Sequence, residues 1–196
     1  MTERAAASEP AERDRAIGAV LLARARAAIA RELGCETGPV PDHPDLADGG
    51  ASFVTLTEAG QLRGCIGTLS AVRALRDDVD RNAVNAAFRD PRFMPLGRDE
   101  LAAVDVEVSV LSEPEFMQFT SEADALAQLR PGIDGVIFSS GCRQSTFLPQ
   151  VWEMLPDVRD FMGHLKRKAG LPADFWGPDV MLARYQVLKF KESEAE

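Results

Sequence analysis

Apolar residues recur along this chain with two different periods, and the change of period marks the expected elements. From Ile17 to Ile29 they recur at helical spacing, and Gly34 follows as a glycine of the kind that ends helices. Residues 104–110 instead alternate valine with polar residues, which is the clearest strand pattern in the sequence. Helices and strands are therefore both expected.

Turn residues define the other elements. Residues 53–57 and 62–69 predict two strands of a hairpin joined by Glu58-Ala59-Gly60. Proline-rich loops are expected over 36–50 and 89–97, and residues 1–12 have no apolar period and are expected to form a disordered tail. Further helices are predicted over 72–88, over 121–130 and from Asp157 to Gly170, and further strands over 135–140, 145–148 and 181–190.

Length and composition favour an ordinary globular protein. The chain has 196 residues, of which 45% are hydrophobic and 27% charged, so it can bury a core of its own. No linker or repeat forces two independent domains, and residues 13–193 are expected to form a single domain. Because strands are mixed with helices and include a hairpin, the pattern predicts the α+β class, with mixed or antiparallel sheets flanked by helices.

Charge and composition exclude several kinds of partner and site. A net charge of −9 would repel a phosphate backbone, so nucleic acid is not expected as a partner despite the local basic group Lys166-Arg167-Lys168. No apolar run approaches a membrane span, and no signal peptide is visible. The three cysteines form no CxxC pair, which favours a reducing compartment and a cytoplasmic protein. With two histidines and none of the familiar nucleotide-binding motifs, no metal site and no cofactor are predicted.

The segment Leu62–Thr68 is the first candidate site. Gly64 and Gly67 interrupt a predicted strand, where glycine weakens packing and often marks a bulge or a close approach by another group. Cys65 lies between them and is the candidate nucleophile, and Arg63 would share its face of an ideal strand and could favour the thiolate. The alternative is that Cys65 is a small buried hydrophobe and the glycines shape a bulge.

The loop that follows residue 88 is the second candidate. Asp90 and Arg92 lie there beside two prolines, and arginine forks suit carboxylate or phosphate ligands. An internal pair between an arginine and the aspartate, which would fix the loop, is the alternative use of the same residues.

Two further stretches offer polar groups. Thr146 and Gln150 provide neutral hydrogen bonding where a strand ends at a proline, and His164 is a candidate base for Cys65. Each candidate segment breaks its local pattern with glycine or proline, and such breaks favour sites over scaffolding. We therefore expect one concavity lined by residues from three segments: Arg63, Cys65, Asp90, Arg92, Thr146 and Gln150.

Six segments occur along the chain in this order: Leu62–Thr68, Phe88–Phe93 with Pro95-Leu96, Glu107–Leu111, Arg130–Gly135, Thr146–Glu153 and His164–Leu171. This ordered set resembles the AMMECR domain family, whose bacterial and archaeal members are called AmmeMemoRadiSam system protein A. The resemblance extends from about residue 15 to residue 190. Met94 stands where a proline is common, and Cys142 occupies a turn that usually carries glycine, so Cys142 is not a family site residue.

The resemblance implies two unequal lobes with the cysteine motif near the cleft between them. It also implies association with a Memo-like protein, which is similar to metal-dependent dioxygenases, and with a radical SAM protein. It implies no activity. Two functions stay open: a Cys-dependent enzyme acting with these partners, and a non-catalytic binding or adaptor module in which Cys65 is structural.

Overall fold

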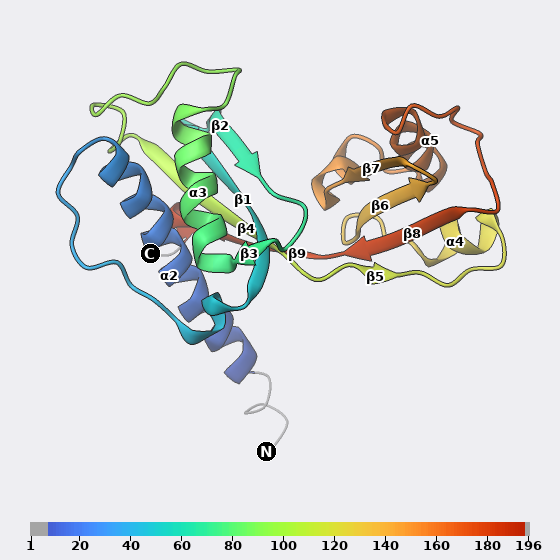
Figure 1. Ribbon diagram of the computed structural model, residues 1–196, viewed down its shortest axis with the longest axis horizontal. Helices are drawn as coiled ribbons and strands as arrows, with labels where there is room; N and C mark the ends of the chain where they lie inside the picture. The colour runs from blue at the N-terminus through green and yellow to red at the C-terminus, as the bar shows by residue number, and fades with distance from the viewer. Residues whose placement is uncertain (1–7, 195–196) are drawn as a thin grey trace. The chain divides into compact units, whose positions relative to one another are not determined.

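The structure is a computed structural model that describes residues 8–194. The chain divides into two compact units, the first running to Leu111 and including the segment from Leu188, the second formed by Ser112–Val187. The described residues form four α-helices and two antiparallel sheets, which confirms the α+β class (Figure 1). No helix in this part of the chain has the length and apolar character needed to cross a membrane.

The first unit is built on a sheet in the order β2-β1-β4-β9. The hairpin of β1 (Gly49–Glu58) and β2 (Gln61–Gly67) lies at one edge, and β4 (Val104–Leu111) pairs with β1 from Ala51 opposite Leu111 to Glu58 opposite Val104. The other edge is β9 (Val187–Lys191), and the short β3 (Arg73–Ala74) pairs with the start of β1.

Helices α2 (Ser8–Glu32) and α3 (Leu75–Phe88) cover one face of this sheet (Figure 1). Two short 3₁₀ helices, η1 (Pro44–Ala47) and η3 (Glu192–Glu194), complete the unit. The core lies between the helices and the alternate strand residues that face them, among them Leu21, Ile29, Val54, Leu56, Val79, Ala83, Val106 and Val108, all fully buried. The intervening strand residues therefore lie on the opposite face.

The second unit has a sheet in the order β5-β8-β6-β7. Its strands are β5 (Glu115–Phe116), β8 (Val180–Tyr185), β6 (Gly135–Ser140) and β7 (Arg143–Phe147), and its helices are α4 (Glu122–Gln128), η2 (Pro149–Glu153) and α5 (Val158–Lys168). The core contains Phe138, Met162 and a stacked pair, Trp152 and Phe161, whose ring centroids lie 3.6 Å apart. Lys166 is also buried, and its ammonium group donates to Glu122 at 2.6 Å.

The predicted helix-capping residues and the hairpin turn are confirmed. Gly34 has a φ of +68° and ends α2, the hydroxyl of Ser121 accepts from the amide of Asp124, and Asp157 caps α5. The hairpin also formed, with its turn at Ala59 and Gly60.

Several boundaries differ from the predictions. Strand β1 begins at Gly49, inside the loop predicted over 36–50 and before the strand predicted from 53, because Gly49 and Gly50 pair with β3. Helix α2 begins at Ser8, so residues 8–12 are helical rather than part of a tail, whereas residues 1–7 lie outside the described part of the chain. Pro10 is compatible with this start because early helical positions need no amide hydrogen. Helix α3 begins three residues late because Arg73 and Ala74 pair with β1. The single strand predicted over 181–190 is two strands in different sheets, separated at Gln186.

Candidate functional site

A bulge in β2 sets the orientation of the cysteine motif. The pairing with β1 runs from Thr57 opposite Leu62 to Leu56 opposite Gly64, so Arg63 is the extra residue. Beyond the bulge, Ile66 packs against the core. Because strand residues alternate, Cys65 lies on the face of the sheet opposite the helices.

The two glycines allow close packing on opposite faces of β2. A Cβ placed on Gly64 would lie 2.2 Å from the backbone oxygen of Ala86 in α3, whereas one on Gly67 would lie 2.2 Å from the ring of Phe53. Glycine at the first position brings the helix backbone against the strand, and at the second it makes room for the aromatic ring. Both predictions for this segment, a bulge and a close approach, therefore describe the motif.

Asp90 and Arg92 bind the backbone of Cys65 from the loop after α3. The Asp90 carboxylate accepts from the amide of Cys65 at 2.9 Å, and the Arg92 guanidinium donates to the carbonyl of Cys65 at 3.2 Å. The two side chains also pair with each other, at 2.6 Å between Nη2 of Arg92 and Oδ2 of Asp90. Because β2 is an edge strand, this pair occupies backbone groups that a further strand would otherwise use.

Acid titration can test this contact. The Arg92 guanidinium holds the pKa of the Asp90 carboxyl well below the ordinary value of about 4. A depressed folded-state pKa contributes stability above the unfolded-state pKa, and this contribution is lost as the pH falls through the folded-state value. We therefore expect urea unfolding to show the largest stability difference between the wild type and Asp90→Asn near neutral pH. The difference should shrink below about pH 4, and a constant difference across the titration would contradict the assignment.

The thiol of Cys65 lies among polar groups. The hydroxyl of Thr55, directly opposite on β1, donates to the sulfur at 3.3 Å. On the other side of Thr55, β4 places Glu107 opposite it, and the Ser109 hydroxyl donates to Glu107 at 3.5 Å. Cys65 is half-buried, as is Cys35 in the loop after α2.

Arg63 has a different partner from the one predicted. Its guanidinium donates to both carboxylate oxygens of Glu100, at 2.7 and 3.0 Å, and Glu100 also accepts from the amide of Gly97. The hydrogen bond from Arg63 lowers the pKa of Glu100. The charge of Arg63 is thus already balanced by a carboxylate, and the bulge explains why ideal alternation misplaced the side chain.

The remaining predicted residues belong to the second unit. The Thr146 hydroxyl donates to the carbonyl of Val136 at 2.9 Å and is 3.1 Å from the hydroxyl of Tyr185. Gln150 is exposed in η2, and His164 is exposed on α5. That these residues share one site with Cys65 stays a prediction.

Comparison with known proteins settles the family. The AMMECR1 family model matches residues 22–190. A protein of Methanothermobacter thermautotrophicus is 40% identical over 188 residues, which cover 93% of this chain and 97% of the relative. Protein SSO0193 of Saccharolobus solfataricus is 36% identical over 187 residues, covering 91% and 82%. This chain belongs to the AMMECR1 family.

A solved structure agrees with the fold. The crystal structure of uncharacterized protein PH0010 from Pyrococcus horikoshii has a TM-score of 0.74 and 34% identity, and the match covers 88% of this chain and 89% of that one. The similarity supports the fold. It carries no reaction, because that protein is itself described as uncharacterized.

The site in this AMMECR1 chain also includes residues that were not predicted as site residues from the sequence. Thr55 and Glu107 were predicted only as strand residues, yet they share the face of Cys65. The signal that could have found them is alternation, because Thr55 and Thr57 in β1, and Asp105, Glu107 and Ser109 in β4, alternate with core residues and so lie on the opposite face. Among the side chains of residues 12–194, no three from His, Cys, Asp or Glu are grouped to hold a metal ion.

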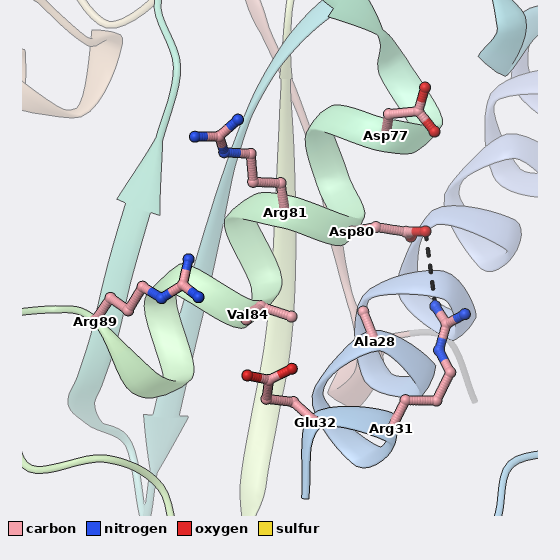
Figure 2. A pocket seen from close by; sticks show the side chains of 8 residues that line it. All are labelled: Ala28, Arg31, Glu32, Asp77, Asp80, Arg81, Val84 and Arg89. Carbon is pink, nitrogen blue, oxygen red and sulfur yellow. Dashed lines mark ion pairs between the residues drawn. The ribbon is translucent and has the colours of Figure 1, made fainter.

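A charged groove of about 450 Å³ lies between α2 and α3, away from the motif (Figure 2). Asp80 on one wall accepts from Arg24 at 2.8 Å and lies 3.7 Å from Arg31 on the other. Burial raises the pKa of the Asp80 carboxyl, which these arginines partly offset. The charges therefore pair across the two helices, and we assign the groove to helix packing.

Proposed function

We propose that Cys65 is a functional thiol and that this AMMECR1-family chain is a Cys-dependent enzyme that acts with a Memo-like dioxygenase-type protein and a radical SAM protein. One observation carries the proposal: the thiol lies on the face of the sheet opposite the helices, beside a hydroxyl donor, rather than in the core.

A structural cysteine usually packs as a small hydrophobe. Here the neighbours Gly64 and Ile66 occupy the core side of β2, and Cys65 lies on the other face. Hydrogen bonds hold both the amide and the carbonyl of Cys65, so the backbone that carries the thiol is fixed in position. The Thr55 hydroxyl is the kind of donor that stabilises charge developing on a reacting sulfur.

Native-state alkylation tests the proposal. We expect iodoacetamide at neutral pH to modify Cys65 faster than Cys35 or Cys142, because the rate follows thiolate character as well as access. Cys142 is the exposed reference and Cys35 the half-buried one, so the chain contains both controls for access. Peptide mapping by mass spectrometry ranks the three rates, and Cys65 ranking last would contradict the proposal.

Thr55→Val provides a matched variant. Valine preserves the branched shape and removes only the hydroxyl that donates to the sulfur. We expect slower labelling of Cys65 with the rates of Cys35 and Cys142 unchanged. An unchanged rate at all three cysteines would show that the hydroxyl does not assist the thiol.

The second candidate function is a non-catalytic binding or adaptor module. The observation that favours it is that Asp90 and Arg92 are already paired with each other and with the backbone of β2. Neither group is then free for a small polar substrate. Under this function Cys65 should react only after denaturation, and Cys65→Ser should retain binding to a purified Memo-like protein.

A further inference from the structure

A second groove, of about 620 Å³, lies beside β9 at the edge of the first sheet away from the cysteine motif. One wall is a stripe of α2 formed by Arg15, Gly18, Ala19 and Leu22. Gly18 and Ala19 each lie three or four residues from both Arg15 and Leu22, so the four positions lie on one face of the helix. We call this feature the β9 groove.

Residues from both faces of β9 line the groove. The ring of Phe190 lies against Gly18 on the helix side, where a Cβ would come within 2.2 Å of it. Lys191 points to the other side, where its ammonium group is 3.6 Å from Asp105. The groove therefore adjoins β9, the last strand in the sheet order. In the sheet order, no strand of the described chain pairs with the outer edge of β9.

The charged residues of the lining are mainly cationic, namely Arg15, Lys189 and Lys191. Arg15 and Lys189 are exposed, and among the side chains described, those of residues 12–194, neither has a carboxylate within 4.0 Å. Glu194 is the one acidic residue in the lining. In a chain of net charge −9, this makes the β9 groove a local positive site.

We propose that the β9 groove binds a short, extended, acidic segment of a partner protein as an added strand on β9. An unpaired strand edge supplies backbone donors and acceptors, and alternate pockets read alternate side chains. Acidic side chains would meet Lys189 and Lys191 on one face of the added strand, and apolar ones would meet Phe190 and the α2 stripe on the other. This interaction is separate from the proposed chemistry of Cys65.

A second copy of the chain fits this edge less well. Pairing β9 with itself would bring Lys189 and Lys191 of both copies together, and edge lysines are a common device against such pairing. The same lysines attract carboxylates. Charge therefore selects an acidic segment as the occupant.

A designed peptide tests the proposal. The probe is a fluorescein-labelled octapeptide that alternates valine with glutamate, and the control peptide replaces each glutamate by lysine. Fluorescence anisotropy should show binding of the acidic peptide only, weakening as salt is raised. Amide hydrogen exchange should show added protection within residues 188–191, which a purely electrostatic contact would not produce.

Three variants of the full chain locate the binding. Lys189→Glu and Ala19→Glu each place a carboxylate at the groove, and both positions are exposed, so the fold should be retained. We expect each to weaken binding about tenfold. The matched control is Arg81→Glu, an equal charge reversal on exposed α3, which should leave binding within about twofold.

Three results would overturn the proposal. Equal binding of both peptides, or loss with Arg81→Glu as large as with Lys189→Glu, would show non-specific attraction. Binding that appears only after residues 1–7 are removed would assign the groove to the chain's own N-terminal segment. Concentration-dependent dimers abolished by Ala19→Glu would assign it to a second copy.

Discussion

Gly64→Ala is expected to lower the free energy of unfolding by about 3 kcal/mol or more. The added methyl group would lie 2.2 Å from the backbone oxygen of Ala86 and 3.0 Å from its carbonyl carbon. Backbone atoms cannot rotate away as a side chain can, so β2 and α3 must separate. That separation would open the core between them, where Ala83 and Ala86 are almost completely buried. Urea denaturation measures the loss.

Two other glycines serve as controls. Gly38 has an ordinary φ and no neighbour within 4 Å of an added Cβ, so Gly38→Ala should be neutral or slightly stabilising. Gly67→Ala should give a smaller loss than Gly64→Ala, because its clash is with the ring of Phe53, which can turn. If Gly64→Ala and Gly67→Ala lose equal stability, the close approach of α3 is not what requires Gly64.

The sequence predicted the strands and the turn around the cysteine motif better than the side of the strand to which each side chain points. Alternation and turn residues located the hairpin, and the glycines indicated either a bulge or a close approach. Alternation also put Arg63 on the face of Cys65, but the bulge at Arg63 breaks the alternation, and the guanidinium binds Glu100. A bulge changes the face of one residue without changing the composition of the strand.

Contacts distant in sequence account for most of what could not be predicted. The internal pair between Asp90 and Arg92 was one of the two uses foreseen for that loop. The hydrogen bond from the Cys65 amide to Asp90 joins residues that are 25 positions apart, and no local pattern encodes such a contact. The break at Gln186 was missed for a similar reason, because apolar residues continue on both sides while the strand changes sheets.

The end of the cysteine motif depends on another buried carboxylate. Asp78 in the first turn of α3 is fully buried. It accepts from the amide and hydroxyl of Ser52, at 2.9 and 2.8 Å, from the hydroxyl of Thr68 at 2.5 Å and from the amide of Asn82 at 2.9 Å. Arg73 completes the group as its ion-pair partner. One side chain thus joins β1, β3, α3 and the last residue of the motif.

Asp78→Ala is therefore expected to lower the free energy of unfolding by about 3–5 kcal/mol, because it leaves several donors and one guanidinium without their acceptor. The neighbouring Asp77→Ala is the control. Asp77 is exposed in the same first turn, so it should lose less than about 1 kcal/mol, mainly from the helix dipole. In the folded fraction of Asp78→Ala, the Thr68 amide, which donates to Ser52, should exchange faster because β2 loses its anchor. If Asp78→Ala and Asp77→Ala lost equal stability, the buried hydrogen bonds of Asp78 would contribute nothing beyond the effect of a carboxylate in the first turn of α3.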